Sequence, residues 1–221
     1  GAICAVDVGS TDVLCTTVDN SPARGLCGTG LLDAVAVLLD LGIVDARGRM
    51  LTREEARDEC PELSEEVLAR IVTDDDEQSA FLLSEAQRSF PRITLTQKDI
   101  REFQLAKGAV AAGLSVMLQH VGLAPASLEQ VLLAGAFGAF LRPESAQRVG
   151  LLPPDVSLDR IRFVGNAALA GTRLCLLNHE CRDDAEQIAN EVDYIELSGQ
   201  PDFQMAFMEA MLFPEGAVKG T

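Results

Sequence analysis

Two short strand-like runs that each lead into a glycine, one fully apolar and one with a single arginine, constrain the fold of this chain more than any other feature. Residues 131–134 lead directly into Gly135, and residues 161–164 lead into Gly165. Such runs are typical of parallel strands that are buried on both faces. Helical patterns alternate with the strands along the chain. The sequence therefore predicts an α/β fold with a mostly parallel central sheet flanked by helices.

The clearest single element is a long amphipathic helix that begins after Thr96. The Thr96 hydroxyl can cap the first turn, and Asp99 follows with the charge that favours a helix N-terminus. Apolar residues then recur at spacings of three and four from Ile100 to Val121. Gly122 is placed to end the helix.

The remaining elements fit a single subdomain over residues 1–221, with a polar excursion at about 45–95. In that excursion, residues 52–78 are expected to form short exposed helices and a loop. Strands are expected over residues 2–8, 13–18, 81–83, 92–95 and 194–197. We expect the strands at 81–83 and 92–95 to pair with each other. Further helices are expected from residue 31 to Gly42 and over 167–178, 183–191 and 202–211.

The composition excludes several classes of function. The net charge of −16 argues against a nucleic-acid or anionic-membrane partner. No apolar run reaches the roughly 18 residues of a membrane span, and the six cysteines contain no C-x-x-C pair. We therefore expect a cytoplasmic protein with free thiols and no metal site. Its acidic surface is either simply solvated or steers a partner protein.

Three glycine-rich segments could bind an anion or a flat ring. Two are the turns at Gly135 and Gly165, where glycine lets a ligand approach the backbone closely. The third is residues 25–30, where Gly28, Thr29 and Gly30 open a helix and present free N–H groups. It lacks the G-K-[ST] ending of a P-loop, and a tight helix N-terminus is the alternative. Its cysteine is interpreted as a packing residue rather than a redox thiol.

The segment Asp7-Val8-Gly9-Ser10-Thr11 matches the D-x-G-[ST]-T phosphate hairpin of actin-like ATPases. In that fold a second half must follow the hairpin, and it does not fit into the remaining chain. We therefore interpret the match as coincidence.

Four segments together resemble one family, the reductive activators of corrinoid proteins. These are ferredoxin-containing members of the actin-like ATPase superfamily, which also includes sugar kinases. The resemblance spans roughly residues 20–213. It is carried by residues 25–33 (GLCGTGLLD), 95–101 with Ala106 and Lys107, 132–138 (LLAGAFG) and 164–168 (VGNAA).

The resemblance implies a larger protein than this chain. A [2Fe–2S] ferredoxin-like domain would come first, then two actin-like half-domains with ATP and Mg²⁺ between them. ATP hydrolysis would accompany electron transfer to a Co(II) corrinoid, restoring Co(I). This chain would be the C-terminal part, with the ferredoxin domain and the first half-domain absent. We expect no ATPase activity from it alone and assign no catalytic residue.

The resemblance also implies nucleotide-binding residues: Gly28, Thr29, Gly30, Lys107, Gly135, Ala136, Phe137 and Gly138. The turn from Gly135 to Gly138 would contact adenosine, with Lys107 nearby, although an exposed helix lysine is the alternative. The implied partner is a corrinoid protein or methyltransferase subunit, and a homodimer is possible. Two other hypotheses stay open: a complete small sugar- or acetate-kinase-like phosphotransferase that uses residues 7–11, and a non-catalytic module that docks a corrinoid protein.

Overall fold

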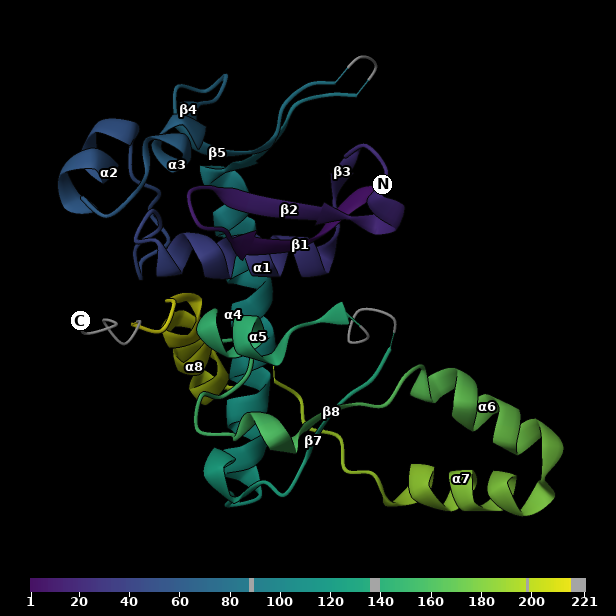
Figure 1. Cartoon of the computed structure of the whole chain (residues 1–221). Helices are drawn as coiled ribbons and strands as arrows, with labels where there is room; N and C mark the ends of the chain where they lie inside the picture. Colours follow the sequence, from purple (N-terminus) through teal and green to yellow (C-terminus); the bar gives the residue numbers. More distant parts are fainter. Residues whose placement is uncertain (88–89, 136–139, 198, 216–221) are drawn as a thin grey trace.

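The computed structural model describes residues 1–87, 90–135, 140–197 and 199–215, and its strands form three sheets (Figure 1). In the first sheet β1 (Ala2–Val8) lies between its two neighbours. It pairs antiparallel with β2 (Val13–Thr17) and parallel with β3 (Gly25–Leu26). The N-terminal strands are therefore confirmed as a hairpin, and the third strand begins the glycine-rich segment.

The other two sheets contain the remaining strands. The order β4 (Ile71–Thr73), β5 (Ser79–Ser84), β6 (Ile93–Thr96) is antiparallel throughout. This confirms the expected pairing of the two strands before the long helix. β7 (Val131–Leu133) and β8 (Ile161–Phe163) pair in parallel. The α/β class is confirmed, with parallel pairing at β1–β3 and β7–β8. The predicted burial of β7 and β8 on both faces is wrong, because they form a two-stranded sheet in which Leu132 is 56% and Phe163 45% exposed.

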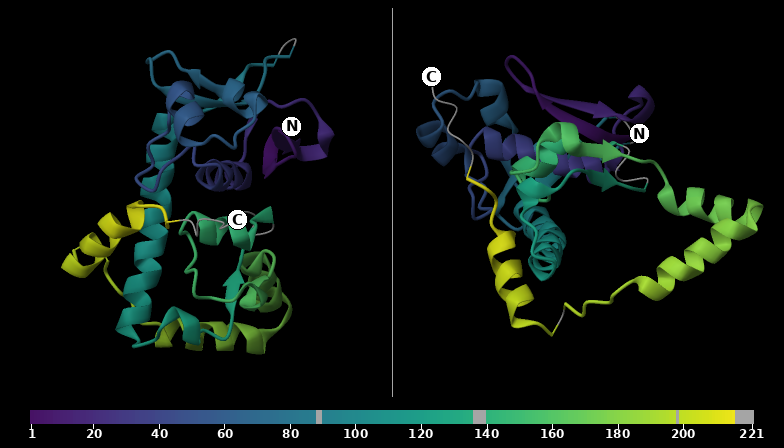
Figure 2. Two further views of the ribbon diagram at one scale, coloured as in Figure 1. Left: turned by 60° about the vertical axis from the view of Figure 1, so that its left-hand side comes forward. Right: turned by 90° about the horizontal axis from the view of Figure 1, so that it is seen from below.

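The long helix α4 (Gln97–His120) begins directly after β6, beside the two sheets at the top of Figure 1, and runs down past β7 and β8 (Figures 1 and 2). Its predicted cap is confirmed, because the Thr96 hydroxyl accepts from the Asp99 amide and the Asp99 carboxylate accepts from the Thr96 amide at 2.8 Å. The C-terminal helix α8 (Pro201–Met211) packs along α4. α4 thus connects the upper and lower parts of the molecule.

The core lies where α1 (Gly28–Asp40) covers β1. Apolar side chains from α1, from the sheets β2–β1–β3 and β4–β5–β6 and from the start of α4 fill the core. They include Ile3, Val6, Leu32, Val35, Leu38, Phe81, Leu95 and Ile100. Helix α5 (Pro143–Arg148) packs on α1 as well. The first half of the chain and the segment after β7 therefore share one core.

The polar excursion folds as expected into short helices, α2 (Arg53–Glu59) and α3 (Glu65–Arg70). Both begin with a side-chain cap, from Thr52 and Ser64. The acidic loop that follows is closed by Asp74, whose carboxylate accepts from the amides of Asp76 and Gln78. The structure also contains 3₁₀ turns at Val18–Asn20, Pro125–Ser127 and Leu158–Arg160.

Helices α6 (Ala167–Leu177) and α7 (His179–Glu191) form an arm that projects away from the rest of the molecule (Figures 1 and 2). α7 begins earlier than predicted, because the Asn178 side chain caps it through the Glu180 amide. The strand predicted over residues 194–197 is wrong. That segment has no strand partner among the described residues, and Tyr194 is 84% exposed. Within the described part of the chain, no helix is long and apolar enough to cross a membrane.

Candidate functional site

The two glycine turns lie side by side at the ends of β7 and β8. The Gly135 amide donates to the Gly165 carbonyl at 2.8 Å. Both residues have positive φ, +94° and +74°, and a Cβ placed on either would meet no atom of the described residues within 4 Å. Open space therefore borders bare backbone at the carboxyl ends of two parallel strands, which is where ligands bind in open α/β sheets. We call this place the glycine edge.

Helix α6 begins directly after the glycine edge. Asn166 caps it, its side-chain oxygen accepting from the Leu169 amide at 3.0 Å. The partial positive charge of a helix N-terminus therefore lies next to Gly165. Three of the predicted nucleotide residues, Ala136, Phe137 and Gly138, lie outside the described residues.

The predicted residues at the start of α1 occupy three different environments. Gly28 is exposed and borders a cavity of about 500 Å³ that Phe103 also lines. Thr29 is buried, and its hydroxyl donates to the Cys4 carbonyl at 3.0 Å. A Cβ on Gly30 would lie 2.3 Å from the Ile3 carbonyl oxygen. Thr29 and Gly30 thus pack α1 closely onto β1, and only Gly28 faces open space.

The Cys27 thiol lies at the N-terminus of α1, 3.2 Å from the Thr29 hydroxyl. Burial alone would raise its pKa. The Thr29 hydroxyl and the backbone amides at the helix start favour the thiolate more strongly, so the pKa of Cys27 is lowered overall. Burial raises the pKa of Cys15 and Cys60. Cys27 is therefore expected to be more reactive than Cys15 and Cys60.

We expect iodoacetamide at neutral pH to alkylate Cys27 before Cys15 and Cys60, because the thiolate is the reacting species. Peptide mass spectrometry over a time course measures the three rates. Thr29→Val removes the hydroxyl beside the sulfur and should slow Cys27 specifically. Equal rates at the three positions would contradict the assignment.

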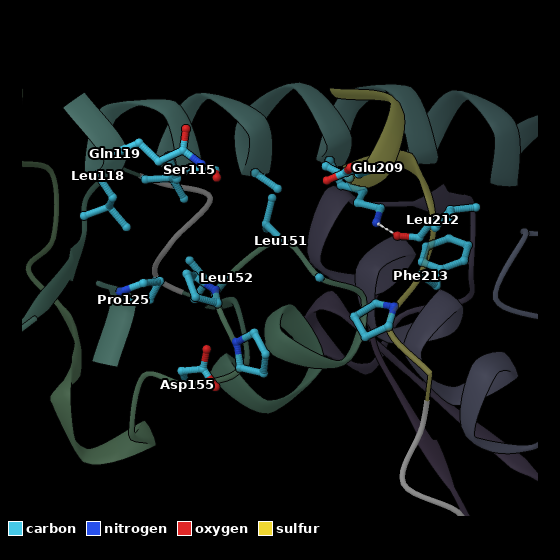
Figure 3. A pocket seen from close by; sticks show the side chains of 18 of the residues that line it. Ser115, Leu118, Gln119, Pro125, Leu151, Leu152, Asp155, Glu209, Leu212 and Phe213 are labelled. Atoms are coloured by element: carbon cyan, nitrogen blue, oxygen red, sulfur yellow. Dashed lines mark hydrogen bonds between the residues drawn. The ribbon is translucent and has the colours of Figure 1, made fainter. Parts of the chain in front are cut away.

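Lys107 is buried, with 3% of its surface exposed, so the exposed-lysine alternative is wrong. Its ammonium donates to the Leu212 carbonyl and lies 4.8 Å from the centre of the Phe213 ring. It lines a cavity of about 510 Å³ between α4, residues 150–155 and the segment after α8 (Figure 3). The residues around that cavity include neither Gly28 nor Gly135. The contacts of Lys107 join α4 to the C-terminal segment.

Burial lowers the pKa of Lys107 from 10.5 to about 8. Between these values the unfolded chain binds more protons than the folded chain, so this group makes stability rise with pH. We expect the free energy of unfolding of the wild type, minus that of Lys107→Met, to increase from pH 8 to pH 10.5 and to be flat below pH 7. Urea denaturation at a series of pH values measures it. A constant difference would show that Lys107 titrates normally.

A second polar cluster joins α1, β1 and the chain before α5. Arg142 donates through Nε to Asp33 at 2.9 Å, and its other nitrogens contact the Asp7 carboxylate and the Val6 carbonyl. The Asp33 side chain is 2% exposed. Its hydrogen bond to Arg142 is the main cause that raises the pKa of the guanidinium. We call these four groups the Arg142 clamp.

No sequence pattern predicted the Arg142 clamp. The only local signal was Asp33 itself, a carboxylate inside an otherwise apolar helical stretch. In the hairpin that resembles a phosphate loop, Asp7 contacts Arg142, and Asp12 forms two bonds of 2.6 Å to Arg70. Both hairpin carboxylates thus have arginine partners. Among the described residues, no three His, Cys, Asp or Glu side chains lie together as a metal site would require.

Comparison with known proteins gives a consistent set of relatives. A family model described as the C-terminal domain of RACo, the ASKHA domain, matches residues 1–220. The corrinoid activation enzyme RamQ of Eubacterium limosum is 30% identical over 221 residues, covering 99% of this chain and 36% of that protein. A [Co(II) methylated amine-specific corrinoid protein] reductase of Methanosarcina barkeri is 32% identical over 102 residues, 46% of this chain and 18% of that protein.

A solved structure titled reductive activator for corrinoid, iron–sulfur protein superposes with a TM-score of 0.82 at 32% identity. The match covers 97% of this chain and 32% of that one. This chain spans about a third of the length of RamQ and of the solved relative.

Proposed function

The chain belongs to the family of RACo C-terminal ASKHA domains, and from that premise we propose that it is the nucleotide-binding C-terminal part of an ATP-dependent activator of corrinoid proteins. The full-length protein would reduce a Co(II) corrinoid to Co(I) on a corrinoid protein or methyltransferase subunit. The names of the relatives support this proposal, since RamQ is a corrinoid activation enzyme and the archaeal relative is a corrinoid protein reductase.

The observation that carries the nucleotide proposal is the glycine edge. Gly135 and Gly165 have no atom of the other described residues within 4 Å of a Cβ position, so among those residues no side chain would block the approach of a purine ring. The N-terminus of α6 favours negative charge at the same edge. When bound and hydrolysed, ATP would supply the free energy for the uphill electron transfer. Gly28 is accessible to a ligand, whereas Thr29, Gly30 and Lys107 would support the site through packing.

The other parts of the activator would lie in the two thirds of the relatives that this chain does not span. We place the [2Fe–2S] cluster and the first actin-like half-domain there, together with any dimer contact. The free state of all six cysteines supports a cytoplasmic setting. The kinase alternative would use Asp7, which the Arg142 clamp already engages.

We expect Gly135→Val in the full-length protein to weaken ATP binding by about tenfold or more, because a branched side chain at φ +94° strains the turn and fills the open space. Isothermal titration calorimetry measures the affinity. Gly122→Val is a matched control, because Gly122 also has positive φ and open surroundings but ends α4. It should leave ATP binding unchanged. Failure of the wild-type protein to bind ATP would overturn the proposal.

A further inference from the structure

We propose that helix α6 and the two-stranded sheet β7–β8 form a docking surface for the part of the full-length activator that lies outside this chain. The inference rests on the proposed function, which supplies that part. It gives a partner to two neighbouring elements whose apolar side chains are left exposed by the described residues.

Helix α6 is apolar, yet its leucines are exposed. Among its 11 residues only Arg173 carries a charge. Leu169 and Leu176 lie seven positions apart, on one face of the helix, and are 64% and 74% exposed. No side chain of α6 or α7 is buried by the described residues, and the two helices pack mainly on each other. Helices of 11 and 13 residues are marginally stable in water without tertiary packing, so α6 needs a further partner.

Polar contacts at the turn join α6 to α7. The Cys175 thiol donates to the Cys181 carbonyl at 3.4 Å, and Arg182 donates to the Cys175 carbonyl at 3.2 Å. α7 is strongly acidic, and its acidic residues are all exposed: Glu180, Asp183, Asp184, Glu186 and Glu191. The arm thus has an apolar helix and a charged helix, so α6 is the helix that docks while α7 stays in water.

The sheet β7–β8 also lacks cover. Each strand has one neighbour, so its outer edge has no strand partner among the described residues. The register sets Leu132 opposite Arg162 and Leu133 opposite Phe163, and successive positions face opposite sides of a sheet. Leu132 and Phe163 therefore expose apolar surface on opposite faces. Because parallel sheets are covered on both faces in folded proteins, this pair needs further strands or helices around it.

The solved relative indicates what covers these elements. Its superposition, with a TM-score of 0.82, covers 97% of this chain and so includes most of the arm, residues 167–191. The matched segment is only 32% of the relative's chain. In a full-length protein of that kind the remainder is covalently joined to this segment, which gives it a high effective concentration at α6 and β7–β8. A second copy or a corrinoid protein would have to bind from solution, so we assign the surface to the same polypeptide.

Maleimide labelling of the purified full-length protein tests this assignment without ATP. Leu169→Cys reports on α6, and Asp184→Cys, on the charged helix of the same arm, is the matched control. Each substituted position lies in a tryptic peptide that contains no native cysteine, so mass spectrometry separates its rate from those of the native thiols. We expect position 169 to react at least about tenfold more slowly than position 184. In urea the two positions should react equally.

A photo-crosslinking residue in place of Leu176 identifies the occupant. Cross-links from a monomeric band to residues outside this chain support the inference. Equal labelling of positions 169 and 184 in the folded protein overturns it. Cross-links confined to this chain, a cross-linked dimer, or protection of position 169 that requires an added corrinoid protein also overturn it, because the occupant is then not the rest of the same polypeptide.

Hydrogen exchange of the wild-type full-length protein needs no substitution and decides the matter if a variant does not fold. We expect the amides of α6 to exchange as slowly as those of α1, which packs on β1 in the core. Fast exchange throughout α6 overturns the inference. None of these measurements uses nucleotide. A protein that protects α6 but does not bind ATP therefore keeps the docking surface and removes the nucleotide proposal, and the reverse result does the opposite.

Discussion

Arg142→Gln is expected to lower the free energy of unfolding by about 3 kcal/mol, because it leaves Asp33 buried without a countercharge. The Asp33 side chain is 2% exposed, whereas the Arg142 side chain is 37% exposed, so solvent screening places the effect at the low end for a broken buried pair. The bond from the guanidinium to the Val6 carbonyl is lost as well. Urea denaturation followed by circular dichroism measures the change.

Arg148→Gln is the matched control for this prediction. Arg148 on α5 pairs with Asp40 on α1 and also donates to the Pro214 carbonyl at 3.0 Å. Because Asp40 is 49% exposed, the loss should be only about 1 kcal/mol. Adding Asp33→Asn to Arg142→Gln should recover much of the stability, because the buried charge is removed. Equal losses for Arg142→Gln and Arg148→Gln would show that burial of Asp33 does not govern the energy of the Arg142 clamp.

The features that sequence predicted well are those with local signals. The N-terminal cap of α4 could be predicted from sequence because Thr96 and Asp99 are only three residues apart and hydrogen-bond directly to each other. β7 and β8 were correctly predicted as strands that end before a glycine, but their burial was not, because apolar residue types do not show what covers a strand and Leu132 and Phe163 are exposed. The strand predicted over residues 194–197 is wrong because a short run of strand-forming residue types does not specify a partner strand, and the described residues supply none.

The contacts that define the site could not be predicted in the same way. Arg142 is 109 positions from Asp33, and Lys107 is 105 positions from Leu212, so no local spacing connects either pair. The two glycine turns were each visible in sequence. Their direct bond depends on the parallel register of β7 and β8, which follows only from the fold. Sequence thus identified the glycines, and the structure identified what anchors them.

Gly30→Ala is expected to destabilise the chain by about 3 kcal/mol, because overpacking against rigid neighbours is costly. The added Cβ would lie 2.3 Å from the Ile3 carbonyl oxygen and 2.9 Å from its carbon, which are backbone atoms of β1. A flexible side chain could move aside, but a paired strand cannot, so α1 would have to shift away from the sheet. Thermal and urea unfolding without nucleotide measure the loss.

Gly171→Ala is the control for this prediction. Gly171 also lies within a helix, α6, and a Cβ there would meet no atom within 4 Å. Alanine favours a helix over glycine by up to about 1 kcal/mol, so this variant should be neutral or more stable. If Gly30→Ala were as stable as wild type yet bound ATP more weakly in the full-length protein, Gly30 would contact the nucleotide directly. A loss of stability without nucleotide would instead assign Gly30 to the packing of α1 on β1.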